Sequence, residues 1–398
     1  MNNFDVSNKY IKDWSVFIFI LLLSPVLSFI WGCNLVFRQS FVNENRMYIF
    51  IFSVACLLGY INTMKIPSSD TIYYISWYAN VDRLNPVHSF LYYRGFYSLI
   101  EPCFVLISLL FNYVALGDVK CYLFLCTVFI YVLQSISIYQ VSKVVHAPNT
   151  IIVLLIILLA FYNPLFIQSV HALRQMLATS IFMFAISRRV VTGKNSWWLI
   201  LSSLLTHTSV IVFIPIILIP LAFEKLTFKR IFLIFSLSLF FLVGYSSIGT
   251  FLQGSSFEYL SYVGDKIVTS ADHNQMNLDL KGFYLYNIPF LSLTLFSLLN
   301  IKKTSGLITV YYILYFVTFF VIVTNLISSE VSVRYSMFIC SFFPYCLLAF
   351  AMSCRKYSQV ILQFMAIAFV LYFCYLLLGD TSYDSVPYNL LKPFPIIF

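Results

Sequence analysis

Apolar residues along this chain come in blocks of about 20, separated by short polar stretches. An α-helix of about 20 residues crosses the hydrocarbon core of a bilayer, which is roughly 30 Å thick. The pattern therefore predicts an all-α, polytopic transmembrane helix bundle of about 11 to 13 helices. The predicted helices cover residues 14–37, 47–63, 96–117, 121–141, 149–167, 171–191, 196–222, 228–251, 283–300, 306–327, 335–352 and 357–378.

The composition agrees with this prediction. Hydrophobic residues make up 61% of the 398 residues and charged residues only 10%, whereas a soluble domain carries about 25% charged residues. No stretch between the blocks is long enough to bury a core of its own, so we expect a single transmembrane domain over residues 1–398, in contact with membrane lipids. The net charge of +9 comes from short clusters at helix ends, without a continuous basic patch, so we expect no nucleic-acid partner.

Four basic clusters predict the orientation, because loops rich in Lys and Arg stay in the cytoplasm. All four clusters are cytoplasmic only if the segment 196–222 forms a hairpin of two short helices that breaks near His207. Residues 252–282 and the tail 379–398 are then external. The clusters are Arg188, Arg189 and Lys194; Lys225, Lys229 and Arg230; Lys302 and Lys303; and Arg355 and Lys356.

The N-terminal part is ambiguous, because two basic residues precede the first predicted helix and two follow it. Loop 64–95 is cytoplasmic if 96–117 crosses the membrane, and external if 96–117 dips in and returns. The dipeptide Glu101-Pro102 near the start of this segment suits a re-entrant or surface-lying helix, so we favour the external placement.

The segment HALRQMLATS carries the most informative polar residues. His171, Arg174 and Gln175 stand at i, i+3 and i+4, so we expect them to share one face of a helix. A cation at the centre of a membrane helix costs about 2.5–3.5 kcal/mol on insertion scales, and it therefore usually faces a partner or a wet cavity. We interpret the three residues as substrate-binding; alternatively, Arg174 extends outward to lipid headgroups.

Three further residues are candidates for catalysis. His207 lies in an apolar run, where it either carries protons or forms a structural hydrogen bond between helices. Asp70 and Glu101 are acids on or near loop 64–95, and a glycosyl transfer needs a base for the acceptor hydroxyl. Asp70 can instead be a solvated loop residue, and Glu101 can simply favour the dipole of the helix that follows it.

Arg334 precedes the predicted helix 335–352. It can hold a diphosphate or pair with Glu330 as an interfacial anchor. No Walker loop, GxGxxG, HExxH or GxSxG motif occurs, which argues against a nucleotide-driven pump or a zinc protease. We expect neither a cofactor nor a metal. In a glycosyl transfer without them, the glycosyl group would have to arrive already activated.

The runs LRQMLATSIFMFAISRRVVTGK (173–194) and LLTHTSVIVFIPIILI (204–219) resemble the EpsG-like, Wzy-type polysaccharide polymerases of bacteria. In that family, an RQ-x-x-A helix and a basic loop precede a helix with His-x-Ser. Three further features are similar, each a short motif in the same order along the chain: Asp70 with Tyr74, Glu101 with Pro102, and Arg334-Tyr335 followed by the late Pro387-Tyr388.

The resemblance implies a multi-helix glycosyltransferase, a multi-pass protein of the bacterial inner membrane. It would polymerise oligosaccharide repeat units carried on undecaprenyl diphosphate into O-antigen, capsule or exopolysaccharide at the outer face, with a chain-length regulator protein as a partner. We expect Arg174 and Arg334 to hold the diphosphate and His207 or Asp70 to take the acceptor proton. Tyr335 and Tyr388 are further substrate-binding candidates by resemblance.

Two other function classes remain open. A flippase or transporter for the lipid-linked unit would also place polar residues within helices, although the chain shows none of the internal repeats common in transporters. A glycan ligase would use similar external residues, and a membrane acyltransferase is a further alternative. Longer glycan on the lipid identifies a polymerase, and unchanged length identifies a carrier.

Overall fold

In the computed structural model, the described part of the chain is helical and contains no β-strand. It divides into two compact units, which are described separately: unit 1 comprises residues 1–208 and 355–398, and unit 2 comprises residues 209–354. The predicted all-α class is confirmed. The structure describes residues 3–37, 43–67, 70–82, 84–85, 87–88, 101–213, 228–256, 261, 264–265, 268, 321 and 329–390.

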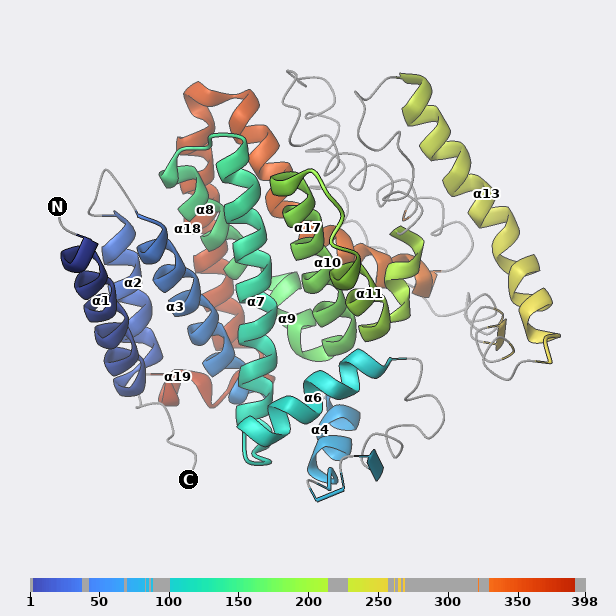
Figure 1. The fold of residues 1–398 in the computed structure, drawn as a ribbon, viewed down its shortest axis with the longest axis horizontal. Helices are drawn as coiled ribbons and strands as arrows, with labels where there is room; N and C mark the ends of the chain where they lie inside the picture. Colours follow the sequence, from blue (N-terminus) through green and yellow to red (C-terminus); the bar gives the residue numbers. More distant parts are fainter. Residues whose placement is uncertain are drawn as a thin grey trace. The chain divides into compact units, whose positions relative to one another are not determined.

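Unit 1 is built around one long central helix, α7, which packs against α3, α8 and α10 (Figure 1). Polar side chains join these helices inside the bundle: Asn62 of α3 donates to Thr127 of α7, and Gln134 of α7 donates to Ser180 of α10. Such bonds hold helices together where water is absent. The helices are α1 (Asn3–Leu23), α2 (Pro25–Phe37), α3 (Glu44–Thr63), α4 (Asp70–Ala79), α6 (Pro102–Val114), α7 (Val119–Val144), α8 (Asn149–Ala160), α9 (Asn163–His171), α10 (Leu173–Thr192), α11 (Trp197–Thr206), α18 (Arg355–Gly379), η6 (Thr381–Tyr383) and α19 (Val386–Asn389).

Unit 2 contains most of the short 3-10 helix η2 (Thr208–Phe213), and the helices α13 (Phe228–Gln253) and α17 (Ser329–Ser353). Within this unit, the Phe213 ring packs on Phe338 of α17 with ring centres 4.6 Å apart. The predicted helices 283–300 and 306–327 lie outside the described residues, apart from position 321.

Among the described residues, four helices are long and apolar enough to cross a membrane. They are α3, α7, residues 335–352 of α17 and residues 357–379 of α18. The bent pair α8 and α9 passes the same test when taken together. The chain is therefore a multi-pass membrane protein, as predicted.

The predicted helix 149–167 is bent by 52° between α8 and α9. Pro164 stands in the first turn of α9, where its missing N–H costs no helical hydrogen bond. Proline at this position permits a new helix to begin but not the old one to continue. After the bend, α9 runs to His171 and packs against α4, α7 and α10.

The prediction of a single spanning helix over 14–37 is wrong. The chain breaks at Ser24, α2 begins at Pro25, and α1 and α2 lie side by side (Figure 1). The cause is again a proline, which has no N–H to continue the hydrogen bonds of α1. Gly32 of α2 allows close packing on α3, because a Cβ there would lie 2.6 Å from Oγ of Ser53.

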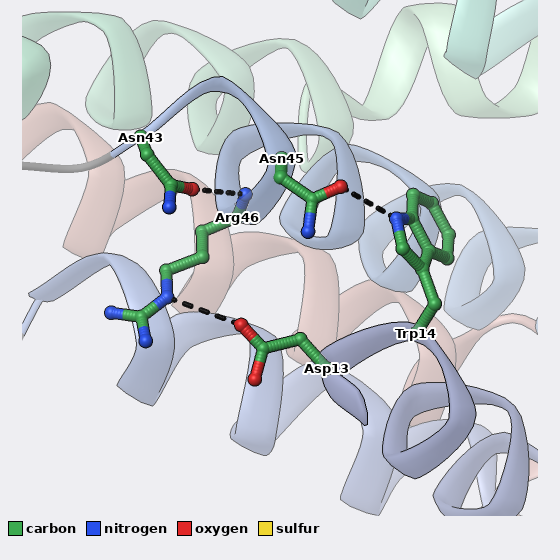
Figure 2. Close-up of polar contacts among 5 residues, drawn as sticks. All are labelled: Asp13, Trp14, Asn43, Asn45 and Arg46. Carbon is green, nitrogen blue, oxygen red and sulfur yellow. Dashed lines mark hydrogen bonds and ion pairs between the residues drawn. The ribbon is translucent and has the colours of Figure 1, made fainter. Parts of the chain in front are cut away.

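Figure 2 shows how α1 is attached to the first turn of α3. Arg46 Nε donates to a carboxylate oxygen of Asp13 at 3.4 Å, and the Trp14 indole donates to the Asn45 side chain at 2.6 Å. Asn43 caps α3 by accepting from the Arg46 N–H. The middle of α1 and the start of α3 are therefore at the same level, so the α1–α2 pair forms a hairpin that returns to the end from which it came.

Segment 96–117 is described only from position 101, and α6 covers 13 of its residues. At 1.5 Å per residue this is about 20 Å, too short to cross a hydrocarbon core of roughly 30 Å. The helix packs against α7 and α11. Its length agrees with the interpretation of a re-entrant or surface-lying helix rather than a full span.

The two ends of unit 1 differ in charge. The starts of α3 and α18 and the connections α7–α8 and α10–α11 lie at one end (Figure 1). That end carries Lys12, Arg46, Lys143, Arg188, Arg189, Lys194, Arg355 and Lys356, with Asp13 and Glu44. The opposite end carries Asp70, Glu101, Asp118, Asp380 and Asp384, with Lys65 and Lys120. We call the first of these two ends of unit 1 the basic end and the opposite one the acidic end.

The close contact of α3 with α7 predicts a strong effect of a side chain at Gly59. A Cβ there would lie 2.9 Å from a ring carbon of Phe124 and 3.0 Å from a methyl group of Val128. Gly59→Leu is expected to destabilise the fold by about 1–3 kcal/mol through overpacking and to lower the melting temperature in detergent. Gly379→Leu is the control, since nothing lies within 4 Å of a Cβ at Gly379; equal melting temperatures would contradict the packing described.

Candidate active site

Arg174 lies in the first turn of α10 and contacts two residues from distant parts of the chain. Its Nη1 donates to Oε2 of Glu101 at 2.5 Å, and its Nε donates to the Tyr74 hydroxyl at 3.0 Å. The guanidinium also lies 5.5 Å from the centre of the Tyr74 ring. The side chains of Arg174 and Glu101 are 12% and 10% exposed. We call these three residues the arginine cluster.

The position of the cation is unfavourable by itself. The first turn of a helix carries a partial positive charge, so Arg174 is repelled by the dipole of its own helix. Burial adds a desolvation cost, which the nearby carboxylate offsets only with good geometry. A guanidinium held in this way matches the geometry of a phosphate as well as that of a carboxylate. The arrangement is suited to binding an anion.

Glu101 precedes α6 and occupies its N-cap position, yet its side chain makes no capping hydrogen bond. The backbone carbonyl of Glu101 accepts from Phe104 and Val105, while the carboxylate extends to Arg174. The interpretation that Glu101 merely favours the dipole of its own helix therefore does not account for the direction of its side chain. Its contact with Arg174 places it in the candidate site.

Tyr74 fixes the orientation of the guanidinium. Its ring packs edge-on against Phe104 of α6, with ring centres 5.7 Å apart, and the residue is 3% exposed. Burial raises the pKa of the Tyr74 phenol, although Arg174 opposes this shift. Tyr74 is therefore a neutral hydroxyl group that accepts from Arg174 and retains its own proton for donation. The helix that carries it is joined to α9, since the Thr71 hydroxyl donates to the Val170 carbonyl at 3.0 Å.

The prediction that His171 shares a helical face with Arg174 and Gln175 is wrong. His171 ends α9, and the backbone breaks at Ala172 (φ −111°, ψ 47°) before α10 begins. The His171 ring contacts Lys65 instead, with 2.7 Å between Nε2 and Nζ. Lys65 was not predicted as a site residue from the sequence, because a lysine directly after an apolar helix is typical of an interfacial anchor. Gln175 is buried, 5% exposed, one position beyond Arg174.

His207 lies at the level of Arg174 on a neighbouring helix. The Ser203 hydroxyl of α11 donates to the Ala178 carbonyl of α10 at 2.7 Å. The two helices are antiparallel, so one turn further toward the acidic end brings His207 to the level of Arg174. The predicted break near His207 is confirmed: α11 ends at Thr206, His207 is extended (φ −157°, ψ 128°), and η2 follows. The second arm of the predicted hairpin lies mostly outside the described residues.

The remaining candidates lie elsewhere or are described only in part. Asp70 is exposed at the first residue of α4, one turn from Tyr74. Arg334 and Tyr335 belong to α17 of unit 2, where the Tyr335 ring packs against Phe213. Tyr388 belongs to α19, and its side chain is outside the described set. The assignment of these four residues to the site stays a prediction.

No group of three or more His, Cys, Asp or Glu residues arranged to hold a metal ion occurs within the described ranges. The side chains of the arginine cluster themselves are suited to binding an anion, donating from a hydroxyl group and accepting a proton at a carboxylate.

The described helices define a multi-pass all-α membrane protein with a mostly buried arginine cluster at one end of unit 1. Residues 45–390 match the EpsG family, and the chain belongs to that family. The predicted family resemblance is thereby confirmed. EpsG-like proteins are similar to Wzy-type polymerases and are associated with glycosyltransferase-like activity in polysaccharide biosynthesis, which implies a lipid-linked oligosaccharide substrate. Neither the search of curated proteins nor that of solved structures found a match.

Proposed function

We propose that this protein is a glycosyltransferase of the bacterial inner membrane that polymerises undecaprenyl-diphosphate-linked repeat units into a surface polysaccharide. The observation that carries the proposal is the arginine cluster: a mostly buried guanidinium held by a carboxylate and a phenol. Arginine binds phosphate with two parallel hydrogen bonds, and a carboxylate is a usual base for a sugar hydroxyl. Family membership supplies the substrate class.

The charge distribution of unit 1 supports an external site. Under the positive-inside rule, the basic end faces the cytoplasm and the acidic end, with the arginine cluster, faces outward. The α1–α2 hairpin supports this orientation, because Lys12 and Arg46 lie at the same end. With this orientation, the segments 64–95 and 379–398 are external.

The proposed reaction joins an acceptor hydroxyl oxygen to the anomeric carbon of the donor sugar. The bond from that carbon to the diphosphate oxygen breaks, and the lipid diphosphate leaves with its bonding electrons. Arg174 stabilises the negative charge that develops on the leaving group, and Tyr74 donates to it. The acceptor proton moves to a carboxylate, for which Glu101 is the candidate nearest to Arg174.

The ion pair itself suggests how substrate binding activates the base. A diphosphate that binds Arg174 competes with Glu101 for the same guanidinium. Displacement from Arg174 leaves the carboxylate free to accept a proton. His207, at the same level on α11, and Asp70, one turn before Tyr74, are the alternative proton acceptors. Arg334 remains a sequence-based candidate for binding the leaving diphosphate.

The direct test uses the purified full-length protein in liposomes with lipid-linked repeat units of defined length. A polymerase produces glycan of two or more repeat units on the lipid. Repeat units of unchanged length that cross the bilayer would identify a carrier instead. Transfer of the glycan from the lipid to a different acceptor would identify a ligase. Either of these results contradicts the proposal.

A further inference from the structure

The last described part of the chain folds over the acidic end of unit 1. We call residues 380–390 the C-terminal strap; it contains η6 and α19. The Ile66 N–H donates to the Ser382 carbonyl at 2.9 Å, and the Tyr60 hydroxyl donates to the Asn389 carbonyl at 2.9 Å. The Ser385 hydroxyl donates to the Met64 carbonyl at 3.2 Å. These bonds attach the strap to the C-terminal end of α3.

One side chain of the strap supports a buried lysine. The Tyr383 ring is 2% exposed and packs against Phe166 of α9, with ring centres 5.8 Å apart. Lys65 Nζ lies 5.1 Å from the centre of the same ring, within the range of a cation–π contact. Lys65 is itself only 6% exposed. A lysine that is buried to this extent needs partners for its ammonium group.

The hydrogen-bond partner of Lys65 is His171, whose Nε2 lies 2.7 Å from Nζ. Because the ammonium group is a donor only, a neutral His171 accepts this bond. His171 is the last residue of α9, and Ala172 alone separates it from α10. The carbonyl of the preceding residue, Val170, accepts a hydrogen bond from the Thr71 hydroxyl of α4. The turn around His171 therefore connects α9, α10 and the helix that carries Tyr74.

We infer that Lys65 is a positioning residue: through His171 it fixes the α9–α10 break and thereby sets Arg174 against Tyr74 and Glu101. The C-terminal strap holds Lys65 in place from the side of Tyr383. This inference rests on the proposed function for its effect on catalysis, but its structural part stands on the contacts of Lys65 alone. The C-terminal strap thus has an indirect role in the site, which is to hold Lys65. The strap contributes no described side chain to the arginine cluster itself.

The groups around Lys65 also predict a dependence on pH. Burial lowers the pKa of the Lys65 ammonium to about 8, and the Asp380 carboxylate at the end of α18 opposes this shift. Hydrogen bonds from Ser382 hold the pKa of Asp380 below its usual range, so Asp380 stays charged. Among the described residues, the other titratable groups facing this region are His171 of α9, Tyr383 of η6 and Tyr131 of α7. Above pH 8 the ammonium loses its proton, and with it the attraction to Asp380 and to the Tyr383 ring.

The test compares Lys65→Met, Lys65→Arg and Tyr383→Leu with Lys120→Met, an exposed lysine at the same end of unit 1. Lys65→Met is expected to lower kcat roughly 10- to 100-fold, with a smaller change in KM. The reason is that a small misplacement of a catalytic group, here Arg174, has an effect of about this size. We expect wild-type activity to fall above pH 8, where Lys65 loses its proton. Lys65→Arg keeps a charged donor at that pH, so it should retain kcat and lack this fall. Wild-type kinetics for Lys65→Met, or an unchanged alkaline fall in Lys65→Arg, would overturn the inference.

A second readout does not depend on activity. Hydrogen exchange of the backbone amides over residues 170–176 should become faster in Lys65→Met and in Tyr383→Leu, and stay unchanged in Lys120→Met, because only the first two loosen the turn at His171. Slow, wild-type exchange in both variants would overturn the positioning role. Faster exchange in a protein that polymerises nothing would uphold the positioning role and reject the proposed function.

Discussion

Replacing Arg174 with lysine is expected to reduce polymerisation by about 10²–10³-fold, the usual cost of removing one donor that stabilises charge in a transition state. Lysine keeps the positive charge but carries its three donors on one compact ammonium nitrogen, in place of the planar fork of the guanidinium. It therefore cannot bond both Glu101 and Tyr74 in the observed directions. The measurement is the rate of chain growth on lipid-linked repeat units, in protein whose melting temperature matches that of the wild type.

The chain offers a matched control for this variant. Arg46 also pairs with a carboxylate, Asp13, and its side chain is 9% exposed, compared with 12% for Arg174. The Arg46 pair joins α1 to the first turn of α3 (Figure 2) at the basic end, whereas the arginine cluster lies at the acidic end. Arg46→Lys should therefore leave the rate of chain growth unchanged. Equal losses in Arg46→Lys and Arg174→Lys would mean that both arginines only stabilise the fold.

Replacing Glu101 with glutamine is expected to separate binding from catalysis. If the carboxylate accepts the acceptor proton, kcat should fall by about 10²–10⁴-fold, the range for a lost general base. Glutamine also competes less well than a carboxylate for Arg174, so the variant should bind undecaprenyl diphosphate more tightly than the wild type. Titration of the lipid diphosphate and single-turnover kinetics measure the two effects separately.

The same variant changes stability in a way that the ligand should reverse. Removing the charge of Glu101 leaves a buried guanidinium without its carboxylate, which costs about 3–5 kcal/mol for a fully buried pair and less for this partly exposed one. Added undecaprenyl diphosphate should therefore raise the melting temperature of Glu101→Gln more than that of the wild type. Asp13→Asn is the control, with no such response expected. A Glu101→Gln variant with normal kcat would assign the base to another residue, His207 or Asp70.

The sequence predicted the residue types of the site better than their arrangement. Arg174 was recognisable because a charge within an apolar helix is expensive and usually functional. The pairing of Arg174 with Glu101 was not recognisable from the sequence. No sequence feature near Glu101 indicates that this residue, directly before Pro102, directs its side chain away from its own helix. The two residues are 73 positions apart, and they meet because α6 and α10 both pack against α7 and α11.

Backbone breaks account for the errors. Pro25 was a visible signal that 14–37 should not be one helix, but the length of the apolar run favoured a single span. The break at Ala172 had no such signal, since Ala is the residue most compatible with a helix. It separates His171 from Arg174 and turns the histidine toward Lys65. Lys65 itself resembled an ordinary interfacial anchor, and its burial depends on a strap that is more than 300 positions away along the chain.

The central claim is that the guanidinium of Arg174 receives the lipid diphosphate at the outer face. A cryo-electron microscopy structure of the full-length protein with undecaprenyl diphosphate tests it most directly. We predict a diphosphate in hydrogen-bond contact with Arg174 and Tyr74, and a Glu101 carboxylate displaced from the 2.5 Å contact with Arg174 Nη1. A diphosphate bound elsewhere, with the Arg174–Glu101 pair intact, would contradict the account.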